Sequence, residues 1–329
     1  MKLSDFDYDL PLDLIAQKPA SPKDSSRLMV VNKEIEYKHF YNIIDYLEKG
    51  DVLVVNETKV NKAKIIGRKQ SGSPAELIIE KFKGKKTYCI IKTRHPHKGV
   101  ILFFGKYQCI ILDQEKDLFN VEFNEEVEKI IGDIGILPTP PYIQRKLDKD
   151  SQYQTVYSRK KGSIAAPTAG LHFTKRLLKK IKQKGVKIAK VCLHVDFGTF
   201  LPVRDLKKHK MHSEYFEVDK KNASMINNRK GKLIVVGTTS VRALESVADR
   251  KGEIHAKKGE TDIFIKPGYK FKTNIDMMVT NFHLPKSTLL MLVSSFVGRK
   301  KILDAYRIAV KKKYRFFSFG DAMLITKNI

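Results

Sequence analysis

The spacing of hydrophobic and polar residues changes character twice along the chain. An apolar run at 51–55 predicts a buried strand, which a polar turn ends. Between about residues 62 and 123, short apolar-rich runs follow one another closely, and glycines, prolines or charged turns separate them. No helical period appears until about residue 124, and this rhythm is typical of a small antiparallel barrel. The prolines of 135–142 cannot continue a strand ladder, so we expect the barrel to end there.

Beyond residue 150 the chain alternates strands with helices. The expected elements are, in chain order, helix 173–185, strand 186–195, strand 232–237, helix 238–249 and helices 286–298 and 300–313. Alternation of this kind is typical of a mainly parallel sheet covered by helices. We therefore predict the α/β class, with a mainly parallel α/β domain of residues 1–61 and 143–329. An antiparallel β-barrel domain of residues 62–142 is inserted into it.

Composition favours a cytoplasmic protein. Of the 329 residues 42% are apolar, which is enough for a sizeable core. The longest nearly apolar run, 288–297, is about half as long as a membrane span needs. The acidic N-terminal segment lacks the apolar centre of a signal peptide. The three cysteines lie far apart, as expected of reduced cytosolic thiols: Cys89, Cys109 and Cys192.

The chain is strongly basic, with 63 Lys and Arg against 36 Asp and Glu and a formal net charge of +27. A lysine-rich proteome is one explanation. A polyanionic partner is the other, because each phosphate contact releases counterions. Basic clusters recur along the chain at 81–86, 159–161, 228–232, 298–301 and 311–315. Such a dispersed basic surface favours a structured nucleic acid, although charge alone does not distinguish tRNA from DNA.

Several common site motifs are absent. No GxGxxG follows a strand, and the segment 284–290 resembles a P-loop end except that Pro285 replaces the required glycine. His95 with His97, and His209 with His212, lack cysteine or carboxylate partners at zinc-site spacing. We therefore expect no metal.

Polar turns next to the predicted strands and helices carry the candidate ligand-binding residues. In open α/β sheets, ligands bind at the carboxyl ends of strands, where helix N-termini and loop amides converge. The stretch 162–174 is uncharged in an otherwise basic region, its glycines allow close backbone approach, and His172 is its one imidazole. The candidates are Thr168, Gly170, His172, His194, Thr199, Thr239, Arg242, Asn281, His283 and Lys286.

Several of these residues also have a structural explanation. Thr168, Thr239 and Ser287 are equally suited to capping helices. His194 lies in an apolar strand, where a hydrogen-bonded core histidine is as good an interpretation as a catalyst. Arg242 falls on the first turn of a helix, where a cation opposes the helix dipole unless an anion lies nearby. We favour a functional Arg242 over a solvated surface side chain.

Two acidic residues are further candidates. Glu214 follows His212 by two positions in an extended segment, so both side chains lie on one face. The carboxylate can then orient the imidazole or tune it as a base, although a solvated acid beside a surface histidine explains the pair equally well. Asp321 lies within 314–325, whose aromatic rings are more typical of a core than of a base-stacking surface.

Taken together, these segments resemble the S-adenosylmethionine:tRNA ribosyltransferase-isomerases of queuosine biosynthesis. The similar segments run in order from residue 5 to residue 325, and only the expected barrel diverges. One departure is Asp196-Phe197, where the family usually has glycine and then a small or aliphatic residue, so an acid lies beside the expected pocket. The similar segments include GSIAAPTAGLHFT (162–174), LHVDFGTFLPV (193–203), VVGTTSVRALES (235–246), TNFHLPKSTLL (280–290) and YRFFSFGDAMLI (314–325).

The resemblance implies a reaction and its partners. The substrates are S-adenosylmethionine and a tRNA that carries 7-aminomethyl-7-deazaguanine at the wobble position. The products are epoxyqueuosine-tRNA, adenine and methionine, with no metal and no cofactor other than the S-adenosylmethionine co-substrate. We expect a monomer without a membrane partner.

This chemistry needs a base, a proton donor for adenine and groups that hold the methionine carboxylate. Imidazoles exchange protons near neutrality, because their reference pKa is about 6.5. We rank His172 first as the proton carrier. The expected catalytic residues are His172, His194, His212, His283 and Glu214, and the expected substrate-binding residues are Thr168, Gly170, Thr199, Thr239, Arg242, Asn281, Lys286 and Asp321.

Two rival functions are weaker. A tRNA methyltransferase that uses S-adenosylmethionine would normally carry a glycine-rich loop after its first strand, and that pattern is not found. A tRNA-binding protein without catalysis explains the charge but not the many Gly, Thr and His residues in turns beside predicted strands.

Overall fold

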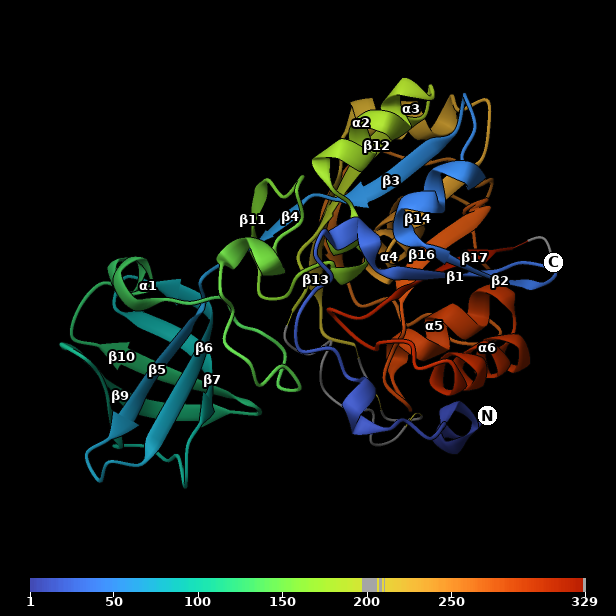
Figure 1. Ribbon diagram of the computed structural model, residues 1–329. Helices are drawn as coiled ribbons and strands as arrows, with labels where there is room; N and C mark the ends of the chain where they lie inside the picture. The colour runs from blue at the N-terminus through green and yellow to red at the C-terminus, as the bar shows by residue number, and fades with distance from the viewer. Residues whose placement is uncertain (197–205, 207–208, 210, 328–329) are drawn as a thin grey trace. The chain divides into compact units, whose positions relative to one another are not determined.

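The chain folds into two compact units (Figure 1). One comprises Met1–Lys59 and Pro140–Ile329, and the other comprises Val60–Thr139. The computed structural model describes residues 1–196, 206, 209 and 211–327. The prediction of an α/β fold with an antiparallel β-barrel is confirmed, and antiparallel strands extend the parallel centre of the large sheet on both sides.

The smaller unit is a closed barrel of antiparallel strands in the order β10-β7-β6-β5-β8-β9. Burial alternates along strands such as β9, because successive side chains face the interior and the solvent in turn. Helix α1 (Val127–Ile134) packs Val127 and Ile130 against that interior. The strands are β5 (Lys64–Lys69), β6 (Pro74–Lys83), β7 (Lys86–Lys92), β8 (Ile101–Phe104), β9 (Tyr107–Glu115) and β10 (Leu118–Phe123).

The larger unit is built on a sheet in the order β15-β13-β12-β3-β14-β16-β17-β1-β2. Its central strands β12, β3, β14 and β16 run parallel, and β3 is buried at every position, as its apolar sequence predicts. The strands are β1 (Arg27–Val31), β2 (Ile35–His39), β3 (Val52–Asn56), β12 (Lys187–Leu193), β13 (Glu214–Val218), β14 (Leu233–Val236), β15 (Lys257–Thr261), β16 (Met277–Asn281) and β17 (Ala322–Thr326). A separate short pair joins β4 (Thr58–Val60) to β11 (Lys160–Ser163).

Helices cover both faces of this sheet. Val52 and Val54 of β3 join one core with α3 to α6, while Leu53 and Val55 join a second core with α2 and the 3-10 helix η4. The helices are α2 (Lys175–Gln183), α3 (Lys220–Asn227), α4 (Thr238–Val247), α5 (Thr288–Val297) and α6 (Arg299–Lys311). The 3-10 helices are η1 (Leu3–Phe6), η2 (Leu12–Leu14), η3 (Lys23–Ser25), η4 (Phe40–Tyr46), η5 (Asp150–Tyr153) and η6 (Thr168–His172).

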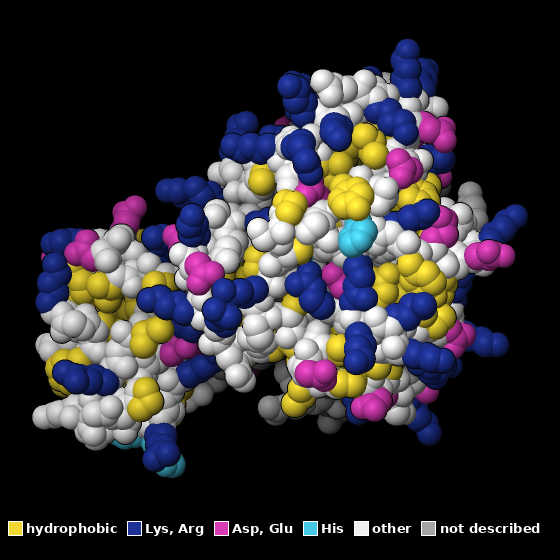
Figure 2. All heavy atoms as spheres, viewed as in Figure 1, with side chains coloured by type: hydrophobic (Ala, Val, Ile, Leu, Met, Phe, Trp, Pro, Cys, Tyr) yellow, Lys and Arg dark blue, Asp and Glu magenta, His cyan; other side chains and the backbone are white. Residues whose placement is uncertain are grey.

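The surface of each unit is basic. Figure 2 shows Lys and Arg side chains spread over the visible face of both units, as the recurring basic clusters predict. Within the described part of the chain, no helix is long and apolar enough to span a lipid bilayer.

Candidate active site

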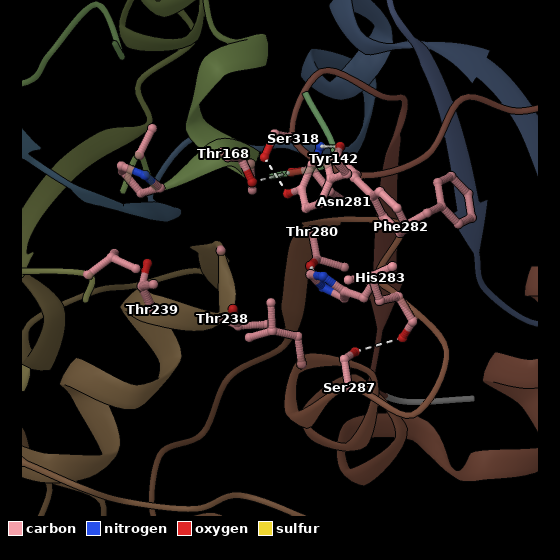
Figure 3. Close-up of a pocket in the computed structure, with 18 residues that line it drawn as sticks. Tyr142, Thr168, Thr238, Thr239, Thr280, Asn281, Phe282, His283, Ser287 and Ser318 are labelled. Carbon is pink, nitrogen blue, oxygen red and sulfur yellow. Dashed lines mark hydrogen bonds between the residues drawn. The ribbon is translucent and has the colours of Figure 1, made fainter. Parts of the chain in front are cut away.

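A pocket opens in the larger unit at the carboxyl ends of β14 and β16 (Figure 3). It encloses about 700 Å³ of empty space when its open mouth is included. No carboxylate, lysine or arginine is among the described residues that line it, and its one imidazole belongs to His283. The lining residues include Tyr142, Thr168, Val195, Gly237, Thr238, Thr239, Thr280, Asn281, Phe282, His283, Ser287, Phe317 and Ser318.

Two helix N-termini reach this pocket. The chain leaves β14 through Gly237, whose φ of 85° lies in the left-handed region that glycine tolerates, and α4 begins at Thr238. The N-cap of α5 is Ser287, whose hydroxyl accepts the Leu290 amide hydrogen at 3.2 Å. Each helix N-terminus carries a partial positive charge, so the wall that they form favours an anionic group of a ligand.

His283 is the imidazole of the pocket. It lies two residues beyond the end of β16, and its Nε2 lies 2.8 Å from the Thr280 hydroxyl. The backbone is fixed as well, because the His283 amide donates to the Tyr306 hydroxyl and its carbonyl accepts from the Tyr8 hydroxyl. Burial lowers the pKa of His283 to about 3, so the ring is neutral near pH 7.

Asn281 links the pocket to His172. Its Oδ1 accepts a hydrogen bond from the Thr168 hydroxyl at 3.3 Å (Figure 3). Its Nδ2 donates to the Phe317 carbonyl at 3.0 Å and lies 3.2 Å from the His172 Nε2. Two segments that are distant in the sequence, η6 and the chain at Phe317, therefore hold this amide group at the pocket wall.

His172 itself is buried behind Asn281 and is not among the residues that line the pocket. Its Nδ1 lies 2.7 Å from the Ser26 hydroxyl, and its ring stacks on Phe40 at 4.8 Å. Since Asn281 donates to Nε2, the proton of the neutral ring belongs on Nδ1. Burial lowers the pKa of His172 to about 4, although the nearby Asp321 carboxylate acts in the opposite direction. The ring holds Asn281 and does not face the pocket.

The glycine beside it, Gly170, does not line the pocket either. A Cβ atom at this position would collide with the hydroxyl of Tyr157. The need for glycine here comes from internal packing.

Two other predicted residues, Thr168 and Thr239, do line the pocket. Thr168 is not a helix cap, because Pro167 precedes η6 and the Thr168 hydroxyl bonds Asn281. The Thr239 hydroxyl accepts from the Asn56 side chain at 3.3 Å, so β3 holds the first turn of α4 in place. The prediction that a threonine caps α4 is wrong, since Gly237 is its N-cap.

Arg242 is buried, so the interpretation as a solvated surface side chain is wrong. Its Nη1 forms an ion pair with the buried Glu214 carboxylate, and its Nε donates to the Ile263 carbonyl at 3.3 Å. Glu214 Oε1 also accepts the Asp196 amide hydrogen at 2.9 Å. Arg242 is the fifth residue of α4 and therefore lies in its second turn, not in the first as predicted, and β13 supplies its anionic partner.

Glu214 does not form the pair that its spacing predicts. The carboxylate next to the His212 ring is that of Asp196, at 3.1 Å from Nδ1, and His212 is largely exposed. Asp196 is the acid at which the sequence departs from the similar family, so this departure supplies the partner of His212. The neighbouring Phe197 lies outside the described residues.

The other predicted site residues lie away from the pocket lining. His194 is bonded to the Thr58 hydroxyl at 2.7 Å and stacks on Tyr215, and burial lowers its pKa. Lys286 is exposed and pairs with Asp7 at 2.7 Å. Asp321 is buried and pairs with Arg27 and Arg315. Thr199 lies outside the described residues.

Sequence reasoning missed several pocket residues, of which Phe317 is the most informative. It has a φ of 68°, a conformation that a bulky side chain rarely adopts and that is typical of functional sites. Its ring packs on Tyr142, whose hydroxyl bonds Ser318 at 2.8 Å. Tyr142 was assigned to the barrel but lies in the larger unit. Tyr142 is a single aromatic residue in a proline-rich connection, and nothing in the sequence pattern indicated that it would reach the pocket.

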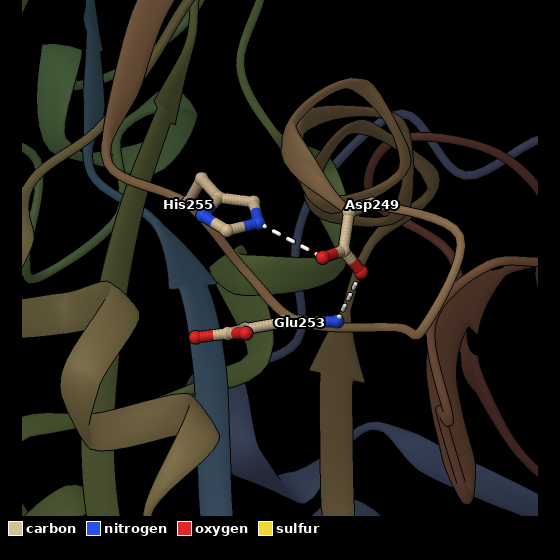
Figure 4. Close-up of side chains that lie close together, drawn as sticks. All are labelled: Asp249, Glu253 and His255. Atoms are coloured by element: carbon tan, nitrogen blue, oxygen red, sulfur yellow. Dashed lines mark hydrogen bonds and ion pairs between the residues drawn. The ribbon is translucent and has the colours of Figure 1, made fainter.

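One cluster outside the pocket resembles a metal site in its residue types. Asp249, Glu253 and His255 lie close together on the surface (Figure 4). Asp249 Oδ1 accepts the amide hydrogens of Lys251 and Glu253, and its Oδ2 lies 3.1 Å from His255 Nε2. These bonds close a turn and account for the cluster without an ion.

The two buried histidines predict how stability depends on pH. Both have a pKa far below the value of about 6.5 in the unfolded chain, so the unfolded state binds more protons at mildly acidic pH. Stability is then complete above about pH 6.5, falls progressively as the pH drops below this value, and levels off only once the pH has fallen through about 4 for His172 and about 3 for His283. We expect urea unfolding at about pH 5 to show a loss of roughly 2 kcal/mol for each histidine relative to about pH 7. The His283→Gln variant should show only about half of this loss of stability. Equal stability of the unaltered protein at both pH values would contradict the prediction.

Comparisons with known proteins give the relatives of the chain. Residues 3–325 match the model of a family described as queuosine biosynthesis protein. The S-adenosylmethionine:tRNA ribosyltransferase-isomerase of Acetivibrio thermocellus is 51% identical over 341 residues, covering 99% of this chain and 100% of that protein. The enzyme of the same name from Halothermothrix orenii is 51% identical with the same coverage. A crystal structure of S-adenosylmethionine tRNA ribosyltransferase from Thermotoga maritima is 37% identical, covers 98% of this chain and 100% of that chain, and superposes with a TM-score of 0.57.

Proposed function

Because the chain belongs to the queuosine biosynthesis protein family and is a transferase of that family, we propose its full reaction. It transfers and isomerises the ribosyl group of S-adenosylmethionine onto 7-aminomethyl-7-deazaguanine at the wobble position of tRNA. The products are epoxyqueuosine-tRNA, adenine and methionine. The observation that carries this proposal is the uncharged pocket at the ends of β14 and β16, with one neutral imidazole in its wall.

The proposed reaction begins with a proton transfer. The sulfonium acidifies the C5′ hydrogens, so a base can form an ylide, which opens the ribose and expels adenine. The aminomethyl nitrogen of the tRNA base then bonds to C1′, which adenine has left, and loses one proton. The C5′ carbon bonds to C1′ to close the carbocycle, and the C4′ alkoxide displaces methionine from C5′ to form the epoxide. The proton taken from C5′ is available for the departing adenine.

We assign the transfer of this proton to His283. Its ring is neutral near pH 7 and offers a nitrogen that can take the proton, and burial, which lowers its pKa, makes the resulting imidazolium a strong acid toward the departing adenine. The N-termini of α4 and α5, at Thr238 and Ser287, would hold the methionine carboxylate. The Tyr142 and Phe317 rings, whose centroids are 4.8 Å apart, offer an apolar wall for the adenine.

We assign a positioning role to His172, which was ranked first from the sequence. Its contact with Asn281 Nδ2 turns the amide so that Oδ1 faces Thr168 at the pocket wall. Arg242 and Glu214 act in the same indirect way, because their ion pair fixes the first turns of α4 below Thr238 and Thr239. His194 and His212 lie outside the described pocket lining, so we assign them no role in the reaction.

Incubation with labelled S-adenosylmethionine and precursor tRNA tests the proposed function. We expect free adenine and methionine, and a tRNA heavier by the transferred group. Release of S-adenosylhomocysteine would instead identify a methyltransferase, and tRNA binding without any product would identify a binding protein. Either result would overturn the proposal.

A further inference from the structure

A second concave surface of the larger unit lies away from the pocket, between α2 and β12. We call it the lysine groove, and it is lined by Val156, Tyr157, Lys175, Leu178, Lys179, Lys182, Gln183, Ile188 and Lys190. Figure 2 shows several Lys and Arg side chains over the area where Figure 1 places α2 and β12. No residue of the lysine groove takes part in the proposed chemistry, so its composition needs another explanation.

Several charges of α2 work against the helix itself, although Lys180 and Lys182 lie in its last turn, where the dipole favours cations. Its nine residues include five cations and no acid, while Leu177 and Ile181 face the core. Lys175 and Lys179, like Arg176 and Lys180, are like charges at spacing i,i+4, and each such pair costs roughly 0.2–0.5 kcal/mol. Lys175 and Arg176 also lie in the first turn, where a cation opposes the helix dipole. A sequence that served only the fold would place acids among these positions.

Three of these lysines have no acid to neutralise them. Arg176 pairs with Asp24 at 3.5 Å, and Lys190 pairs with Glu57 at 3.3 Å. Within the described residues, no salt bridge involves Lys175, Lys179 or Lys182, and all three side chains are exposed. Their positive charge is therefore available to a partner.

The floor of the lysine groove is apolar. Leu178 and Ile188 are partly buried, Val156 is 37% exposed, and the Tyr157 ring lies beside them. The Tyr157 hydroxyl is buried and points toward Gly170, so the groove presents the ring and not the polar end of this side chain. Cations above an apolar and aromatic floor match a nucleic-acid strand, in which phosphates flank sugars and bases.

We propose that the lysine groove binds the phosphate backbone of RNA and so holds the tRNA substrate outside the pocket. Lys175 and Lys182 are seven residues apart, about 10.5 Å along the helix, which spans roughly three phosphates of one strand. A concave site with a narrow apolar floor favours a strand over a lipid surface, which requires an exposed apolar face. The identification of this RNA as tRNA rests on the proposed function. The binding of RNA at the lysine groove rests on the charges and the apolar floor of the groove.

The test compares two triple variants of the full chain. One is Lys175→Gln with Lys179→Gln and Lys182→Gln. The control is Lys220→Gln with Lys251→Gln and Lys257→Gln, which removes the same charge from exposed positions of the same unit. Binding to a labelled tRNA transcript is measured at several salt concentrations. Binding of S-adenosylmethionine is measured separately and shows whether the pocket of each variant is intact.

We expect the groove variant to bind the tRNA transcript at least roughly tenfold more weakly, and its slope of log affinity against log salt to fall by about 2, because three phosphate contacts are lost. The control should lose much less. Equal slopes for the two variants would overturn the proposal, as would unchanged RNA binding with lost binding to phosphatidylserine vesicles. Adenine release by the unaltered protein reports on the proposed function separately. If adenine release is absent while the groove variant still loses RNA affinity, RNA binding by the lysine groove is supported and the proposed function is contradicted.

Discussion

We expect His283→Gln to lower the rate of adenine release at saturating substrates by roughly a hundredfold or more, the typical contribution of a general acid or base. His283 is the one imidazole among the described residues of the pocket lining, and burial keeps its ring neutral near pH 7. Glutamine fills similar space and can still bond Thr280, so the fold should survive. The measurement is the rate per folded molecule under conditions where neither substrate limits.

The matched control is His255→Gln, a surface histidine of the same unit whose ring bonds Asp249. Its rate should be close to that of the unaltered protein. A rate within about threefold of normal for His283→Gln would remove this imidazole from the mechanism. If His172→Gln lost the hundredfold instead, His172 would be the proton carrier and the positioning role would be wrong.

The second large effect concerns the buried ion pair between Arg242 and Glu214. Replacement of Glu214 by alanine leaves a buried guanidinium without its charge partner, so we expect the free energy of unfolding to fall by roughly 3–5 kcal/mol. One Arg242 nitrogen, Nη2, has no hydrogen-bond partner among the residues that the structure describes. Hydrogen exchange of peptides from α4 and β13, followed against urea concentration, reports on this unit directly.

Two variants test the cause of this loss. Glu253→Ala removes an exposed acid of the same unit and should change stability by less than about 0.5 kcal/mol. The double variant Glu214→Met with Arg242→Met removes both charges, so it should be more stable than Glu214→Ala. If the double variant were the less stable of the two, an unpaired charge would not be the reason for the loss.

The sequence predicted the framework of the site well because the framework depends on local patterns. Short apolar-rich runs separated by turns predicted the barrel, and buried apolar runs predicted β3 and β14. The turn after β14 and the segment before α5 were both expected to carry ligand-binding residues, although no strand was predicted at the position of β16. Thr168, Thr239, Asn281 and His283 do meet in the pocket.

The directions of the individual side chains could not be predicted, because residues far away in the chain determine them. His172 and His283 both lie in uncharged turns, yet Ser26 and Phe40 of the N-terminal segment hold the His172 ring behind the pocket wall. Glu214 lies two positions from His212, but α4 brings Arg242 to its carboxylate, and Asp196 takes the place beside His212.

A crystal structure of the protein with bound S-adenosylmethionine tests the central claim most directly. We expect the ligand in the pocket at the carboxyl ends of β14 and β16, with its carboxylate at the N-termini of α4 and α5 and its C5′ carbon within reach of His283. A ligand bound elsewhere, or bound in this pocket with C5′ turned away from His283, would contradict the assignment of this pocket and its imidazole to the reaction.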